Sequence, residues 1–338
     1  MQAENLSREE LAASVRRIGR AVVGGREVQA SRTAFAAAFI RAFHSANEKD
    51  KVFDDPVARQ LLTAEEYALF EEVYFRRATK TSGRGCAPEG SRREIVSTHL
   101  REGTAGGILC RARFAEESLE EAVAGGVRQY VILGAGLDSF ALRRADLLAR
   151  LRVLEVDSPG TQEVKRRRLA SAGLPVPSAV TFAPVDFARE DLHGVLLRAG
   201  FDPDSPAFFS WLGVTYYLGR EPLRATFARL GVLAAPRSRL LFDYLHADAF
   251  HSGKAQPRML ELLESVRFLG EPMQTGLDPT ALAPELAETG WRLREDLSAE
   301  AIEARYLRSR TDGFRVGAHL HLALADRGRG PEISGEPP

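Results

Sequence analysis

Short apolar runs alternate with longer amphipathic stretches along the chain from about residue 129 onward. The apolar runs predict β-strands at 129–133, 151–156, 179–184, 207–212 and 238–244. In the stretches between them apolar residues recur with the helical period, which predicts helices at 139–149, 161–172, 188–199 and 221–234. Because strands and helices alternate, we expect an α/β fold whose parallel sheet is covered by helices on both faces.

Two further strands are predicted near the end of the chain, at 291–295 and 318–325. The second alternates strictly, so His319 and His321 would share one of its faces. With these strands the expected sheet is Rossmann-like, seven-stranded and mostly parallel, with an antiparallel last strand. The segment 253–278 has no regular pattern and predicts an insertion over the functional site.

The chain before this alternation is predicted to be helical. Phe35, Phe39, Ile40 and Phe43 form one apolar helix face, which ends before Asp54-Asp55-Pro56. Further helices are predicted at 61–75 and 114–124, and a loop rich in Gly, Pro and Ser at 81–91 suits a lid. We therefore expect a helical extension or lid at 1–127, a core at 128–326 with an insertion near 250–278, and a disordered tail at 327–338.

Composition narrows the possible partners. The 338 residues carry 46 basic and 46 acidic side chains, and this zero net charge gives no indication of a nucleic-acid partner. The polar N-terminus and the lack of a long apolar segment lead us to expect a cytoplasmic protein without a membrane anchor. Cys86 and Cys110 lack metal-ligand spacing, and His319 and His321 lack a third ligand, so no metal site is expected.

A glycine-rich turn follows the first predicted strand of the core. Gly134 and Gly136 let a ligand approach the backbone closely, and Asp157, at the end of the next strand, is placed to bind ribose hydroxyls. A dinucleotide-binding loop needs a third glycine at the position of Ser139. The pattern therefore favours a cofactor with a ribose but no pyrophosphate, namely S-adenosylmethionine. An NAD(P)-dependent oxidoreductase remains open as an alternative.

Six motifs in chain order resemble the leucine carboxyl methyltransferase family of class I S-adenosylmethionine-dependent methyltransferases. They resemble most closely its bacterial branch of natural-product and uncharacterised members. The motifs are Ser31–Ala34, Asp55–Ala58, Arg111–Phe114, Leu133–Ser139 with Arg143, Glu155–Pro159 with Lys165, and Val185–Phe187. The resemblance extends from about residue 31 to about residue 325 and implies a cofactor site assembled from these segments.

The resemblance also implies a role for each matching residue. Arg111 would pair with the methionine carboxylate of the cofactor, and Asp157 would bind the ribose hydroxyls. Asp186 would accept from the adenine amino group. The full cofactor set implied is Arg111, Gly134, Ala135, Gly136, Asp157, Ser158, Asp186 and Phe187. From the residues alone, Arg111 could equally be a solvated helix arginine, and Asp186 the N-cap of the helix predicted at 188.

The acceptor side matches the family less closely. Many relatives carry an acidic residue just before a glycine after the fourth strand, where this chain has Leu212. His246, after the strand that ends at 244, is the candidate general base, and Trp211, Tyr216 and Tyr217 are candidates for the acceptor pocket. We expect O-methylation of a small, possibly polyketide-like molecule at a hydroxyl or carboxylate. The alternatives are a protein C-terminal carboxyl methyltransferase and a catalytically silent cofactor-binding protein.

Overall fold

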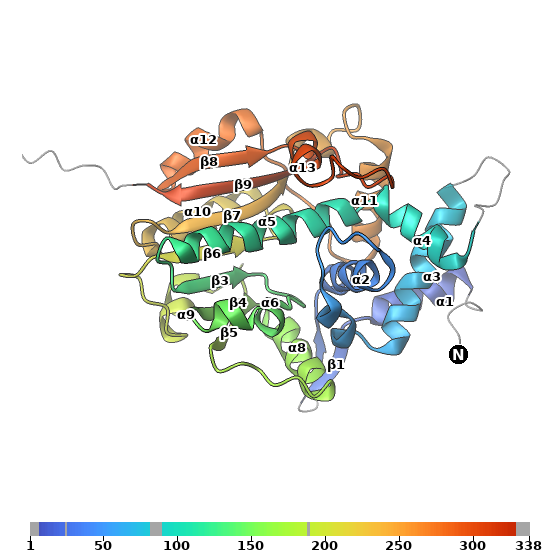
Figure 1. Ribbon diagram of the computed structural model, residues 1–338, viewed down its shortest axis with the longest axis horizontal. Helices are drawn as coiled ribbons and strands as arrows, with labels where there is room; N and C mark the ends of the chain where they lie inside the picture. Colours follow the sequence, from blue (N-terminus) through green and yellow to red (C-terminus); the bar gives the residue numbers. More distant parts are fainter. Residues whose placement is uncertain (1–6, 24–25, 82–89, 188–189, 329–338) are drawn as a thin grey trace, which may run out of the picture.

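The computed structural model describes residues 7–23, 26–81, 90–187 and 190–328. A seven-stranded sheet with strand order β5-β4-β3-β6-β7-β9-β8 forms its centre (Figure 1). The strands are β3 (Gln129–Leu133), β4 (Arg152–Asp157), β5 (Val180–Pro184), β6 (Ala207–Trp211), β7 (Arg239–Leu245), β8 (Trp291–Leu297) and β9 (Leu320–Arg327). β3 to β7 are parallel, whereas β9 runs antiparallel to β7 and β8 and lies between them. The predicted fold class is confirmed.

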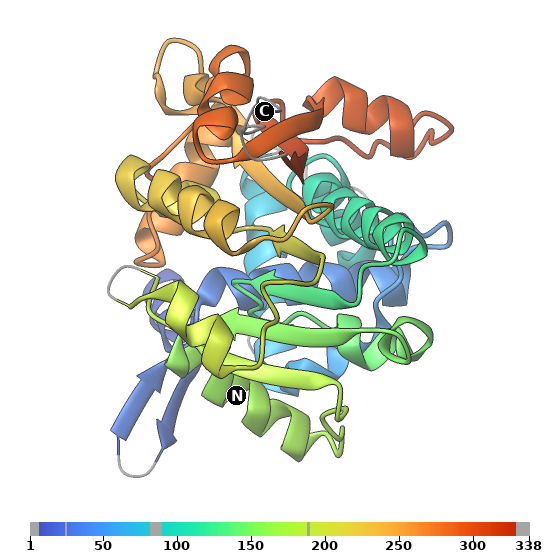
Figure 2. The ribbon, with the colours of Figure 1, turned by 90° about the vertical axis from the view of Figure 1, so that its left-hand side faces the viewer.

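Side chains alternate between the two faces of the sheet, and each face has its own apolar core. On one face, Tyr130 and Ile132 of β3 share a core with helices α5 (Ala105–Ala124), α6 (Phe140–Arg143) and α8 (Pro159–Ser171). On the other, Val131 and Leu133 share a core with α9 (Leu192–Arg198), α10 (Arg220–Leu233) and α12 (Pro279–Glu288). Figure 2 shows the resulting three-layer arrangement, with α5 and α10 on opposite sides of the strands.

Two helices of the core differ from their predicted bounds. The helix expected at 139–149 is two short helices, α6 and α7 (Ala145–Leu148), separated by Arg144. The helix expected at 188 begins instead at Leu192, because Asp191 caps it by accepting from the backbone N–H groups of His193 and Gly194. Asp186 is therefore not the cap of this helix.

The N-terminal part contains α1 (Arg8–Arg17), α2 (Arg32–Asn47), the 3₁₀ helix η2 (Pro56–Leu61), α3 (Ala64–Thr81) and α4 (Arg92–Arg101). The apolar face predicted from Phe35 to Phe43 lies in α2, and its side chains are buried. The prediction of helices throughout is wrong at one place, where β1 (Arg20–Val23) and β2 (Arg26–Gln29) form a hairpin. This hairpin projects from the body of the protein in Figures 1 and 2. Most of the expected lid loop, 82–89, lies outside the described residues.

The C-terminal part also departs from the sequence pattern. The segment 253–278, which was expected to be irregular, contains a regular helix, α11 (Pro257–Phe268). Helix α12 follows it, and α13 (Ala299–Tyr306) comes after β8. β9 begins at Leu320, so His319 precedes the strand and does not share a face of it with His321. Across the described residues, no helix combines the length and the apolar character that crossing a bilayer requires.

Candidate functional site

A large cavity lies at the carboxyl ends of the central strands, where an open α/β sheet usually binds its ligands. Its volume is about 2420 Å³, and its wall combines the turn after β3 with residues of α2, α4, α5 and α11. Figure 1 shows α1 to α4 grouped beyond this end of the sheet, so the N-terminal part forms one side of the cavity. Both the core and the N-terminal extension therefore contribute to the site.

The glycine turn and Asp157 form the floor of this cavity. Gly134 and Gly136 have φ angles of 70° and 50°, in the left-handed region that favours glycine. The Asp157 carboxylate accepts from the backbone N–H groups of Gly136 and Ser158, each at 2.6 Å. Burial raises the pKa of Asp157 above its ordinary value, although these two hydrogen bonds act in the opposite direction. Asp157 thus faces the cavity as a half-buried acceptor whose lone pairs suit ribose hydroxyls.

The residues expected around adenine lie at the next strand end. Asp186 and Phe187 follow β5, and both line the cavity together with Ala135 and Ser158. The backbone N–H of Asp186 donates to the Glu190 carboxylate at 2.8 Å. The structure thus brings every residue of the expected cofactor set to one cavity.

Arg111 projects from α5 toward the segment after β6. Its Nη1 donates to Asp243 Oδ2 at 2.8 Å and to the Tyr216 hydroxyl at 3.0 Å. Burial alone would lower the pKa of Arg111, but Tyr216 and Asp243 raise it above its ordinary value. Arg111 is therefore a permanently charged, fixed guanidinium at the cavity wall. Sequence reasoning missed Asp243, although an acid between Phe242 and Tyr244 in an apolar strand was a usable indication.

Gly213 gives a sharp test of this arrangement. Its φ is 73°, and a Cβ added there would lie 2.8 Å from Arg111 Nη2. Gly213→Ala should therefore displace the guanidinium and weaken S-adenosylmethionine binding by roughly tenfold, besides costing about 1 kcal/mol of stability. Titration calorimetry and urea unfolding measure the two effects, and Gly173→Ala, also at positive φ but with open space around it, is the matched control. Equal cofactor affinity in both variants would contradict the expectation.

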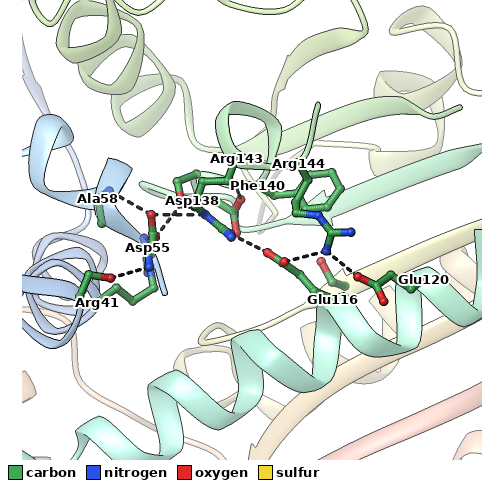
Figure 3. Close-up of polar contacts among 12 residues, drawn as sticks. Arg41, Asp55, Ala58, Glu116, Glu120, Asp138, Phe140, Arg143 and Arg144 are labelled. Atoms are coloured by element: carbon green, nitrogen blue, oxygen red, sulfur yellow. Dashed lines mark hydrogen bonds and ion pairs between the residues drawn. The ribbon is translucent and has the colours of Figure 1, made fainter. Parts of the chain in front are cut away.

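Ser139 occupies the position of the missing third glycine, and its side chain is buried. It contacts an ion network centred on Asp55, which Figure 3 shows with Arg41 and Arg143. Its hydroxyl donates to Asp55 at 2.6 Å, and Asp55 also pairs with Arg41 at 2.8 Å and Arg143 at 3.3 Å. Arg41 in turn donates to the Leu137 carbonyl of the glycine turn at 2.7 Å. The position of the third glycine of a dinucleotide-binding loop is thus occupied by a buried side chain that is engaged in internal contacts.

The network continues to α5. Arg143 pairs with Glu116 of α5 at 2.5 Å, and Arg144 pairs with Glu116 and Glu120 at 3.2 and 2.7 Å (Figure 3). These ion pairs join the glycine turn to α5, the helix that carries Arg111. They thereby stabilise the position of the glycine turn relative to α5.

The connection after α11 covers the cavity from the other side. Glu271 accepts from the Arg32 and Thr33 backbone N–H groups at 2.6 and 3.1 Å and from the Thr33 hydroxyl at 2.6 Å. It thereby closes the N-terminus of α2. The backbone N–H of Gln274 donates to the Tyr216 carbonyl at 2.7 Å, which joins the same connection to the segment after β6. None of these contacts was expected from the sequence.

Two expected site residues lie elsewhere. Trp211 is 0% exposed and packs on Phe227 in the core of the opposite face, so it does not line the cavity. His246 follows β7 directly, but its Nδ1 accepts from the Asp248 backbone N–H at 3.0 Å and caps a short 3₁₀ helix, η4 (Ala247–Phe250). His246 is not among the described residues that line the cavity, so its position gives no support to the expected role as base. Tyr216 and Tyr217 do line it, with ring centroids 4.9 Å apart.

Comparison with known proteins agrees with this geometry. The family model described as leucine carboxyl methyltransferase matches residues 34–231. YktD of Bacillus subtilis (strain 168), named for S-adenosyl-L-methionine-dependent methyl transfer, is 30% identical over 89% of this chain and 99% of its own length. A protein of Mycobacteroides abscessus named for the same activity is 31% identical over 78% of this chain and 83% of its own length.

Among solved structures, a DUF574 family protein from Streptomyces avermitilis has a similar fold, with a TM-score of 0.52 at 15% identity over 86% of this chain and 97% of that one. The cavity, its acidic and glycine-rich floor and the sequence relatives lead to the same conclusion. The chain belongs to the leucine carboxyl methyltransferase family and is an S-adenosylmethionine-dependent methyltransferase.

Proposed function

We propose that this enzyme O-methylates a small, largely hydrophobic molecule at a hydroxyl or a carboxylate. In this proposal Asp157 binds the ribose, Arg111 the methionine carboxylate, and Asp186 with Phe187 the adenine. Gly134 to Gly136 pass beneath the methionine and ribose. The chemistry of these donors and acceptors fits the cofactor, which combines a carboxylate, a ribose diol and an amino-purine.

The size and lining of the cavity carry the acceptor part of the proposal. Pockets for small molecules usually occupy roughly 300–1,000 Å³, and this cavity of about 2420 Å³ is much larger. Beyond the expected cofactor residues, its lining includes apolar side chains of α2, α3, α5 and α11, among them Ile40, Val73, Ile108, Leu262 and Val266. Such a wall favours an apolar acceptor held beside the cofactor.

S-adenosylmethionine supplies an electrophilic methyl group on a sulfonium centre, with a neutral thioether as leaving group. The protein must therefore mainly align the acceptor oxygen and exclude water. Tyr216 stays protonated, since burial raises its pKa well above the ordinary value, and it can donate a hydrogen bond but cannot act as base. A carboxylate acceptor needs no base, because it is already ionised.

A hydroxyl acceptor would benefit from a base, and two histidines line the cavity. Burial lowers the pKa of His99 to about 4 and lowers the pKa of His319 from its ordinary value. Both imidazoles are therefore neutral near pH 7. The Nε2 lone pair of His319, however, already accepts from the Gln256 backbone N–H at 3.3 Å. We therefore propose His99, in place of His246, as the candidate base.

His246→Ala should leave methyl transfer within about twofold of the parent enzyme, since the imidazole caps η4 and does not face the cavity. The lost cap should cost roughly 0.5–1 kcal/mol of stability. His99→Ala, assayed in parallel with the same acceptor, provides the contrast. A large loss of turnover in His246→Ala with unchanged folding would restore His246 as a catalytic group.

The experiment that tests the proposed reaction uses the purified enzyme, cofactor labelled in the methyl group, and fractionated cell extract. Label in the small-molecule fraction that survives mild base identifies a hydroxyl acceptor, whereas base-labile label identifies a carboxyl ester. The family description favours a second candidate, a protein C-terminal carboxylate. Label found only on a protein C-terminus would establish that candidate and overturn the small-molecule proposal.

A further inference from the structure

Asp243 is a buried carboxylate whose partners all belong to one end of the cavity. It is 0% exposed and sits in β7 among apolar residues. Its Oδ2 accepts from Arg111 Nη1 at 2.8 Å, and its Oδ1 accepts from the Gly213 backbone N–H at 2.6 Å. Asp243 does not itself line the cavity, so any effect on a ligand must pass through these neighbours.

The strand register explains why a carboxylate at this position can hold Arg111. β6 and β7 are parallel, and Trp211 pairs with Phe242, so the chain that leaves β6 at Leu212 and Gly213 runs beside Asp243. Leu212 lines the cavity but carries no charge. Asp243 therefore supplies the carboxylate that pairs with Arg111 from the neighbouring strand.

We propose that Asp243 is the positioning residue that fixes Arg111 for the carboxylate of S-adenosylmethionine. This inference rests on the proposed contact between Arg111 and the cofactor. Among the described residues, Arg111 uses only Nη1 for its hydrogen bonds, so the Nε and Nη2 edge of the fork stays available for a bidentate carboxylate. Because the guanidinium is planar, the hydrogen bonds at Nη1 also fix the direction in which the Nε and Nη2 edge points.

The charge of the pair also suits the ligand. Arg111 and Asp243 together are neutral, and the amino-acid end of the cofactor is a zwitterion with no net charge. An unpaired Arg111 would attract the ligand carboxylate but repel its ammonium group. Asp243 therefore contributes to binding mainly by orienting Arg111, and less by changing the net electrostatic attraction for the ligand.

The Asp243→Asn variant separates these effects because both neighbours of Asp243 are donors. Whichever way its amide is turned, the NH₂ group must face either the Gly213 N–H or the Arg111 guanidinium. The variant therefore cannot satisfy both donors, and Arg111 loses its fixed orientation. We expect the affinity for S-adenosylhomocysteine to fall by roughly tenfold or more.

The test compares two ligands by titration calorimetry. S-adenosylhomocysteine contains the amino-acid carboxylate, whereas 5′-methylthioadenosine contains the adenosine and thioether without it. Asp243→Asn should lose affinity for the first ligand and keep its affinity for the second, and Arg111→Lys should show the same selective loss. Combining the two substitutions should add little to the larger single loss, because both act through one contact.

Glu155→Gln is the matched control. Glu155 is likewise a buried strand carboxylate paired with a cation, Lys165, and it does not line the cavity. The Glu155→Gln variant should change the free energy of unfolding without changing the ratio of the affinities for S-adenosylhomocysteine and 5′-methylthioadenosine. If Asp243→Asn does not fold, Asp243→Glu keeps the charge but shifts the carboxylate by one methylene, and the same selective loss is expected.

The outcomes distinguish this inference from the proposed function. If Arg111→Lys loses S-adenosylhomocysteine selectively while the Asp243 variant binds it as tightly as the parent, or more tightly, the positioning role is overturned. Parallel losses of both ligands in the Asp243 variant would also overturn it, by showing a general structural role. A parent enzyme that does not bind S-adenosylhomocysteine, or an Arg111→Lys variant that binds it normally, would instead refute the proposed cofactor contact.

Discussion

Replacing Asp157 by alanine should weaken S-adenosylmethionine binding about a hundredfold, which corresponds to about 2.7 kcal/mol. The loss should exceed that of a single ribose contact, because Asp157 also holds the glycine turn through Gly136 N–H at 2.6 Å. Removing it deletes the charged hydrogen bonds to the ligand, worth roughly 1.5–3 kcal/mol, and loosens the floor on which the ligand lies. Titration calorimetry with S-adenosylmethionine measures the change directly.

Asp191→Ala is the matched control for this variant. Asp191 also accepts from two backbone N–H groups, but it caps α9 and does not line the cavity. It should cost roughly 1 kcal/mol of stability and leave cofactor affinity unchanged. If Asp157→Ala binds the cofactor no worse than Asp191→Ala, the ribose site has been assigned to the wrong strand end.

Asp55→Asn should lower the free energy of unfolding by about 3 kcal/mol at neutral pH, as expected when a buried ion pair loses one partner. Asp55 is 0% exposed and lies between Arg41 and Arg143. Burial alone would raise the pKa of Asp55, but the two guanidinium groups and the Ser139 hydroxyl hold it below its ordinary value. Urea unfolding of parent and variant at pH 7 measures the difference.

The same substitution should change how stability depends on pH. Because the pKa of Asp55 is lower in the folded than in the unfolded protein, its stabilising contribution is present above about pH 4 and is lost as the pH falls through the folded value. The difference in the free energy of unfolding between the parent and Asp55→Asn should therefore become smaller as the pH is lowered. Asp146→Asn, which removes a largely exposed partner of Arg144, should change stability by less than about 1 kcal/mol. A gap that stays constant down to pH 3 would contradict this interpretation.

The core strands could be predicted from the sequence because each is a short apolar run between turn residues. β3 was predicted with its observed bounds, and the adjacent parallel strands within one or two residues. The misplacement of Trp211 was avoidable, since Ser210 and Leu212 line the cavity and a period of two puts Trp211 on the other face. The hairpin at Arg20 to Gln29 was also readable, since two valine-containing runs flank Gly24-Gly25.

Other features depend on contacts between distant parts of the chain, which no local pattern contains. Glu271 lies 239 and 238 residues from the two backbone N–H groups that it binds, and Asp243 is 132 residues from Arg111. His246 was chosen because it follows a strand, but whether a side chain enters a cavity or caps the next turn depends on the path of the backbone after the strand. Helix α11 was missed because Gly and Pro residues flank it and obscure its period.

The wall that the N-terminal extension contributes to the cavity has a consequence for how this family can diversify. Arg111 and Arg41 precede residue 128, whereas Asp157 and Asp243 follow it, and Arg111 pairs directly with Asp243 across that division. A chimera that exchanged residues 1–127 between two relatives would take Arg111 from one parent and Asp243 from the other, and it would also exchange the cavity-lining side chains of α2 and α3. Such an exchange changes the cavity wall and keeps the ion pair only where both parents carry an arginine and a carboxylate at these two positions.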